Sequence, residues 1–136
     1  MQLAESIRKA KRVYIAGNGG SAANAIHIAN DLISVGIKAH ALTADVATLT
    51  AIANDYGYEY VFSRQLEVFA EKGDLLIAMS GSGTSQNILN AIREATWIGM
   101  DVFKIFGNER GEAMQAAEES QLSLGHEAML WLRANP

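Results

Sequence analysis

Short runs of apolar residues alternate along the chain with longer segments in which apolar residues recur at helical spacing. The short runs predict buried strands, at residues 12–16, 38–43, 75–79, 101–106 and 121–124. The longer segments predict helices, at residues 2–11, 21–35, 46–53, 59–71, 86–98, 109–118 and 126–134. Such an alternation is typical of a parallel sheet that is covered by helices on both faces.

Residues at the ends of these segments support the predicted boundaries. Ser21 and Asp45 stand where a helix N-cap is expected, because their side-chain oxygens can accept a hydrogen bond from the first turn. Gly36 and Gly99 stand where helices are expected to end. Because no proline-rich linker or repeat interrupts the pattern, we expect one domain over residues 1–136.

Composition excludes several classes of function. Hydrophobic residues make up 49% of the chain, which is enough for a sizeable core, and the net charge is −4. Clustered positive charge for binding nucleic acid is therefore not expected, and we interpret the one basic run, from Arg8 to Arg12, as a solvated helix end. The chain has no cysteine and no apolar run of ~18 residues, so we expect a cytoplasmic protein without a membrane span.

The first predicted strand runs into a glycine-rich loop, Gly17-Asn18-Gly19-Gly20-Ser21, and then into a helix. Glycines let a ligand approach the backbone, and the free N–H groups and dipole of a helix N-terminus attract anions. The spacing matches neither a Walker loop nor a dinucleotide-binding fingerprint. Taken alone, this loop indicates either an anion site or a tight turn that packs the helix on the strand.

A second loop, Ser80-Gly81-Ser82-Gly83-Thr84-Ser85, also joins an apolar strand to a helix. Hydroxyl and backbone N–H groups can hold a phosphate dianion without any cationic side chain. A helix N-cap needs only one of the four hydroxyl residues in this loop. Because parallel sheets bind ligands at the carboxyl ends of their strands, the two loops together predict a site for a phosphate group.

Several motifs occur here in the order of a known family. The segments from Gly17 to His27, from Thr43 to Gln65 and from Met79 to Asn87 resemble the signatures of the sugar isomerase (SIS) domain of the phosphoheptose isomerase group. The resemblance implies a three-layer, flavodoxin-like α/β fold, with a five-stranded parallel sheet between helices. It also implies a homo-oligomer (dimer or tetramer) that interconverts an aldose phosphate and a ketose phosphate, such as sedoheptulose 7-phosphate, through a cis-enediol.

The resemblance also implies roles for individual residues. It places the phosphate at Ser80, Gly81, Ser82 and Ser85, the sugar along Asn18, Gly19 and Gly20, and the sugar hydroxyls at Asn54 and Asp55. We expect Ser21 and Thr84 to contact the substrate as well. His27 matches a zinc ligand of the family. Asp31 matches a family glutamate that serves as metal ligand and base, so we expect Asp31 as base and His27 as acid.

Two departures from the family pattern keep a second function open. Asp31 is one methylene shorter than the family glutamate, and a base displaced by about 1 Å can lower the rate ~100-fold. The family carries a glutamine and, eight residues later, a histidine in its last helix, and the segment Leu124–Trp131 contains no such pair. His27 is then either a partial zinc ligand or a hydrogen-bonded helix histidine. The chain is accordingly an isomerase or a non-catalytic SIS module that binds a sugar phosphate.

Overall fold

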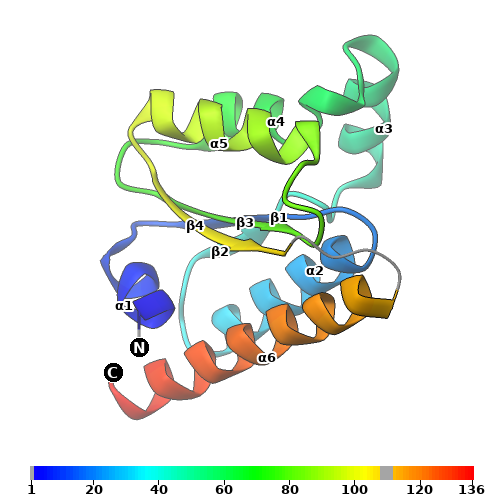
Figure 1. Ribbon diagram of the computed structural model, residues 1–136. Coiled ribbons are helices and arrows are strands. Elements are labelled where there is room, and N and C mark those ends of the chain that lie inside the picture. Colours follow the sequence, from blue (N-terminus) through cyan, green and yellow to red (C-terminus); the bar gives the residue numbers. More distant parts are fainter. Residues whose placement is uncertain (1, 108–111) are drawn as a thin grey trace.

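A computed structural model describes residues 2–107 and 112–136, which form a parallel sheet with helices on both faces (Figure 1). The described residues contain four strands, which run across the sheet in the order β2-β1-β3-β4. Their bounds are Ala39–Ala41 for β2, Val13–Ala16 for β1, Leu75–Ser80 for β3 and Asp101–Phe106 for β4. Every neighbouring pair is parallel, as the sequence predicts.

The helices form two layers. One face carries α1 (Gln2–Lys9), α2 (Gly20–Ser34) and α6 (Glu112–Ala134), which lie below the sheet in Figure 1. The other face carries α3 (Val46–Asp55), a 3-10 turn η1 (Tyr58–Tyr60), α4 (Ser63–Phe69) and α5 (Gln86–Ile98). The three-layer α/β architecture is therefore confirmed.

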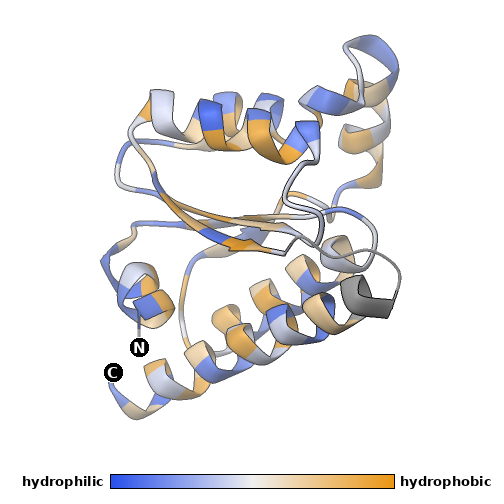
Figure 2. Cartoon of the chain, viewed as in Figure 1, coloured by the Kyte–Doolittle hydropathy of each residue, from blue (hydrophilic) through white to orange (hydrophobic). Residues whose placement is uncertain are grey.

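Alternation along the strands divides the core between these layers. Ile15 and Ile77 point to the layer of α1, α2 and α6, whereas Tyr14 and Leu76 point to the layer of α3, α4 and α5. All residues of β1 and β3 are buried, which explains why both strands are apolar without interruption. Figure 2 shows the apolar residues along these strands and on the helix faces that turn toward them.

The predicted fifth strand, at 121–124, is wrong. Residues 121–124 lie in the middle of α6. This one helix replaces three predicted elements: the helix 109–118, the strand 121–124 and the helix 126–134. Residues 109–111 of the first of these lie outside the described residues. Leu122 and Leu124 alternate as in a strand, but the residues that α6 buries are Gln121, Gly125, Ala128, Met129 and Leu132. That spacing is helical, so packing of one face of a long helix decides the structure.

Three helix boundaries also differ from the predicted ones. Gly19, not Ser21, occupies the N-cap position of α2, because its φ of 57° is one that glycine adopts without strain. The helix α3 continues to Asp55. The predicted helix 59–71 is divided into η1 and α4.

The N-cap of α3 is confirmed. Asp45 accepts hydrogen bonds from the backbone N–H and the hydroxyl of Thr48, at 3.2 and 2.7 Å. These hydrogen bonds hold the pKa of the Asp45 carboxyl below its usual value. The sequence therefore placed this helix start correctly.

Strand order brings the two predicted loops together. β1 and β3 are neighbours in the sheet, with Ala16 opposite Ala78, and both loops follow the carboxyl ends of these strands. The chain moves from β1 to β2 on one side and then to β3 on the other, so the loops flank a topological switch point. Open parallel sheets bind ligands at such points.

Close packing of α2 against α6 brings the second part of the site together. Asn24 donates a hydrogen bond to the Glu118 carbonyl oxygen, and the two helices run in the same direction from there (Figure 1). Gly125 lies directly against Ile28: a Cβ atom at position 125 would come within 2.6 Å of Ile28 Cγ1. Glycine at this position therefore permits the close approach of the two helices.

None of the helices in the described ranges combines the length and the apolar character that crossing a membrane requires.

Candidate functional site

Three serine hydroxyls form a triangle in the second loop. The Oγ atoms of Ser80, Ser82 and Ser85 are 3.3, 3.4 and 3.5 Å apart. These separations exceed the 2.7–2.8 Å that O–H···O hydrogen bonds prefer, so the hydroxyl groups can turn toward a bound oxygen at little cost. The triangle thus offers three donors to one anionic group.

The backbone around the triangle keeps it in place. The N–H groups of Gly83 and Thr84 donate to Ser80 Oγ and Ser82 Oγ, at 3.0 and 3.2 Å. The Thr84 hydroxyl also donates to Ser82 Oγ, so Thr84 supports the triangle. Ser85 is the N-cap residue of α5, yet its side chain makes no capping hydrogen bond. The hydroxyl of Ser85 is therefore directed to the triangle, beside the positive end of the α5 dipole.

The first loop is joined to the second by a pair of asparagines. Asn18 and Asn87 each donate a side-chain amide hydrogen to the other's oxygen, at 2.8 Å in both directions. The hydroxyl of Tyr58 donates to Asn18 Oδ1 at 2.9 Å. Asn87 is buried and lies in the first turn of α5, two residues after Ser85 of the serine triangle. Neither Asn87 nor Tyr58 was predicted as a site residue, because the role of each depends on a contact between segments that are distant in the sequence.

The glycines of the first loop meet α6. A side chain at Gly20 would overlap the carboxylate of Glu118, so the Glu118 side chain lies over the N-terminus of α2. Ser21 is buried, its Cβ position close to Gly17, and its backbone N–H donates to the Asn18 carbonyl oxygen. Its hydroxyl is thus less accessible to a ligand than the backbone of Gly19 and Gly20, which are exposed.

Asn54 and Asp55 lie at the end of α3, where both are exposed. The Asn54 side-chain amide donates to Asp55 Oδ1 at 3.1 Å. They belong to the layer that also contains α5, the helix that begins after the serine triangle. Their assignment to the sugar hydroxyls stays a prediction.

Two histidines flank a buried aspartate between α2 and α6. Asp31 Oδ2 lies 3.6 Å from His27 Nε2 and 3.5 Å from His126 Nδ1. The Asp31 side chain is 12% exposed, whereas both histidine side chains are 54% exposed. Asp31 Oδ2 itself is buried and makes no hydrogen bond. A buried carboxylate oxygen without a partner is costly, so this cluster is suited to a proton or a cation.

The structure identifies His126 as the second histidine beside Asp31. Only the packing of α6 on α2 shows that His126 faces Asp31. Eight residues before His126 stands Glu118, which lies over Gly20. The spacing of the family's glutamine and histidine is therefore present, with a carboxylate in place of the amide. Glu118 lies before the segment Leu124–Trp131, in which the pair was expected.

A hollow of ≈380 Å³ opens beside the histidine cluster. Its lining includes His27, His126 and Glu127. His27 lies seven residues beyond Gly20 on α2, so the hollow is about 10 Å along the helix from the glycine loop. An elongated ligand could span this distance.

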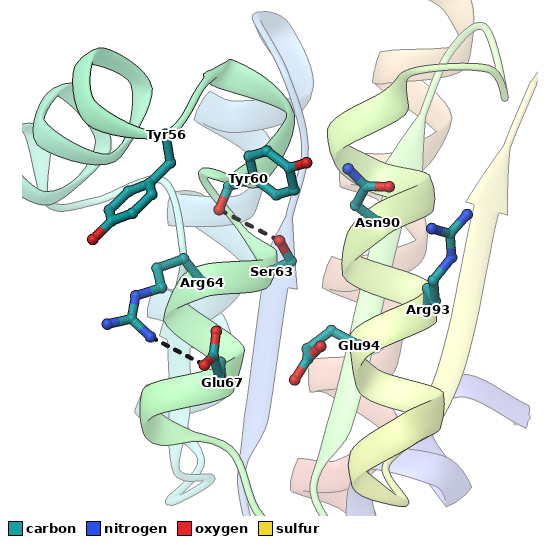
Figure 3. Close-up of a pocket in the computed structure, with 8 residues that line it drawn as sticks. All are labelled: Tyr56, Tyr60, Ser63, Arg64, Glu67, Asn90, Arg93 and Glu94. Atoms are coloured by element: carbon teal, nitrogen blue, oxygen red, sulfur yellow. Dashed lines mark hydrogen bonds and ion pairs between the residues drawn. The ribbon is translucent and has the colours of Figure 1, made fainter.

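A separate cleft of ≈720 Å³ lies between α4 and α5 and contains none of the predicted site residues (Figure 3). Its lining mixes charges: Arg64 pairs with Glu67 at 3.2 Å, and Arg93 and Glu94 project from α5. Balanced charges of this kind do not favour a phosphate dianion. The serine triangle is therefore the better candidate site for an anion.

Comparison with known proteins agrees with these features. The family model described as the SIS domain matches residues 1–107. A phosphoheptose isomerase from Campylobacter concisus is 44% identical over 129 residues, which cover 90% of this chain and 68% of that protein. One from Burkholderia pseudomallei is 49% identical over 119 residues, which cover 83% of this chain and 60% of that protein. The chain thus spans about two thirds of the length of these relatives.

A solved structure shows the same fold. A phosphoheptose isomerase from Neisseria gonorrhoeae superimposes with a TM-score of 0.87 at 28% sequence identity. The superposition covers 97% of this chain and 81% of that protein.

Proposed function

The chain belongs to the SIS domain family, and we propose that it interconverts an aldose phosphate and a ketose phosphate, with sedoheptulose 7-phosphate as the expected substrate. One observation carries the proposal: α2 begins at the loop beside the serine triangle and carries His27 and Asp31, which face His126. The same helix thereby links an anion site to a cluster for proton transfer. The related phosphoheptose isomerases support this choice of reaction.

The serine triangle would hold the phosphate. Hydroxyls of Ser80, Ser82 and Ser85 donate to phosphate oxygens, and the N-terminus of α5 adds a favourable dipole. Asn18 and the exposed backbone of Gly19 and Gly20 then border the carbon chain. Binding of the unreactive end fixes the reacting carbons, which is how positioning accelerates the reaction.

The histidine cluster would move the protons. Isomerisation of the aldose requires a base that takes the proton from C2 and an acid that protonates the carbonyl oxygen at C1, which gives the cis-enediol. The base then returns its proton to C1 while the deprotonated acid takes the proton of the hydroxyl at C2, which becomes the carbonyl. Asp31 is the proposed base, and His27 or His126 is the proposed acid. The non-catalytic alternative is not favoured, because an SIS module that only binds has no need of this cluster.

We propose that His27, Asp31 and His126 also hold zinc. In the described ranges no three His, Cys, Asp or Glu side chains are grouped closely enough to hold a metal ion as they stand. The donors are nevertheless those that zinc prefers, and their separations of 3.5 and 3.6 Å are close to the ~3.3 Å between neighbouring ligands of a tetrahedral zinc ion. When bound, zinc would polarise the carbonyl oxygen of the sugar. Metal analysis of Asp31→Ala against the unchanged protein tests this proposal.

A coupled assay with sedoheptulose 7-phosphate, with and without added zinc, tests the activity. The double variant Ser82→Ala/Ser85→Ala should lose binding of the sugar phosphate, and Asp31→Asn should keep binding but lose turnover. The matched control is Ser6→Ala/Ser63→Ala, which removes two hydroxyls outside the loop and the histidine cluster. Binding without turnover in the unchanged protein, at any zinc concentration, would support the non-catalytic module instead.

We further propose that the protein works as a homo-oligomer. Large apolar side chains are exposed on the layer of α3, α4 and α5, among them Val46, Val68 and Trp97, and Trp97 is 86% exposed. Exposed apolar surface of this kind is characteristic of a protein interface. Sedimentation of the protein, with Trp97→Glu as the disrupting variant, would show whether this layer joins two copies.

A further inference from the structure

A third pocket lies at the other end of the sheet, apart from the hollow beside the histidine cluster and the cleft between α4 and α5. It measures ≈500 Å³ and is lined by the start of β1, the start of β2 and the end of α4. Both phosphate-site loops follow the carboxyl ends of strands, whereas this pocket lies at amino ends. It therefore belongs to a different region of the protein from the proposed isomerase site.

The polar side chains that line this pocket are cationic or neutral. Arg12, Lys38 and His40 converge on it from β1, β2 and their approaches, and no carboxylate lines it. Among the described residues, none of the three is held in an ion pair. In a chain with a net charge of −4, these three residues concentrate positive charge at the pocket. The carboxylates of Asp74 and Glu71 are close enough to act on the Tyr14 hydroxyl, but they do not line the pocket.

This arrangement separates Arg12 from the rest of the basic run. Arg8 lies over the ring of Trp131, 4.6 Å from its centre, and donates to the Asn135 carbonyl oxygen, so it ties α1 to α6. The aliphatic part of Lys11 lies against Gly73. Arg12 alone among these three lines the pocket.

An aromatic wall completes the pocket. Phe69 is 55% exposed at the end of α4, next to the cationic side chains. The hydroxyl of Tyr14 donates to the Phe69 carbonyl oxygen at 3.2 Å, and the Tyr14 ring meets the ring of His40 edge to face. These contacts hold the aromatic wall beside the cations. A flat apolar group could pack on Phe69 while an attached anion meets Arg12 and Lys38.

We infer that this pocket binds a small organic anion with a flat ring, and that a nucleoside monophosphate is the matching chemical class. The phosphate of such a ligand carries the charge that Arg12 and Lys38 attract, and its base supplies the flat surface for Phe69. The volume of the pocket is within the range of small-molecule sites.

Titration of the ¹⁵N-labelled protein with AMP, followed by NMR, tests the inference. AMP should shift the amide signals of residues 12–14, 38–40 and 69. Adenosine, which lacks the anion, and inorganic phosphate, which lacks the ring, should each bind at least tenfold more weakly there. AMP shifts that are confined to residues 80–85, or no shift at millimolar AMP, would overturn the inference.

Two variants and one control sharpen the result. Lys38→Glu and Phe69→Ala should each lower AMP affinity at least tenfold. The control is Lys104→Glu, an equal charge change on the exposed strand β4 at the opposite edge of the sheet, which should leave the affinity within twofold. Equal losses in Lys38→Glu and Lys104→Glu would show a general charge effect and overturn the inference. Phe69→Ala keeps every charge, so it decides the matter if Lys38→Glu does not fold.

Discussion

Asn18 and Asn87 exchange two side-chain hydrogen bonds, although 69 residues separate them in the chain. The exchange joins the glycine loop after β1 to the first turn of α5, directly behind the serine triangle. Asn87 is 2% exposed, so water cannot replace the lost partner if one amide is removed. The pair therefore fixes the distance between the two loops before any ligand arrives.

Asn87→Leu should lower both stability and affinity. The substitution leaves the Asn18 amide with an unpaired group, which costs about 1–3 kcal/mol of unfolding free energy, and it frees the first loop to move. Urea denaturation and sugar-phosphate binding measure the two effects. In the double-mutant cycle with Asn18→Ala the losses should be less than additive, because each single change already breaks the pair. Strict additivity would show that the two amides do not act together.

His126→Asn should separate binding from catalysis. The imidazole lies 3.5 Å from Asp31 Oδ2, at the end of the site away from the serine triangle. Loss of a proton donor there should lower kcat by about 10²–10⁴ and leave KM nearly unchanged. The same measurement on His27→Asn identifies which imidazole is the acid. The variant that removes the acid should show the larger fall in kcat.

Glu119→Gln is the matched control for this prediction, because Glu119 is an exposed residue of α6 outside the cluster. It should keep the full rate. If His126→Asn raised KM and left kcat unchanged, His126 would bind substrate without transferring a proton.

Gly125→Ala should destabilise the protein and disturb the histidine cluster. Alanine normally favours a helix by about 1 kcal/mol over glycine. Here its Cβ would lie 2.6 Å from Ile28 Cγ1, a buried β-branched side chain that cannot move aside. Overpacking typically costs about 1–3 kcal/mol, so thermal unfolding should show a net loss. The double variant Gly125→Ala/Ile28→Ala should be more stable than the sum of the losses in the two single variants predicts. If the losses in unfolding free energy simply add, the strain does not arise between these two residues.

Tyr14→Phe should reduce the loss of folding stability that we expect at alkaline pH. Burial of the Tyr14 hydroxyl, reinforced by the nearby Asp74 carboxylate and opposed by Arg12, raises its pKa above 10.0. The unfolded chain therefore loses this proton at a lower pH than the folded protein does. The contribution of Tyr14 is complete below about pH 10 and declines as the pH rises further. Stability of the unchanged protein should fall more steeply above pH 10 than that of Tyr14→Phe, as urea denaturation would show.

Much of the fold follows from local patterns that the sequence displays. Continuous apolar residues in β1 and β3 predict buried parallel strands, and Gly99 ends α5 with a φ of 94°. Asp45 caps α3 as predicted. In each case the deciding interactions lie within a few residues of one another, so the sequence alone is sufficient.

The three serine hydroxyls come together for the same reason, because they lie within six consecutive residues. The contacts of Asn18 with Asn87 and of Asp31 with His126 could not be predicted, because the order of the strands and the packing of α2 on α6 decide them. The false strand at 121–124 has the same origin: its alternating leucines fit a strand, and only the apolar surface of the rest of the protein selects the helix. Local residues thus determined which hydroxyl and backbone groups each loop presents, whereas burial between distant segments decided which side chains meet there.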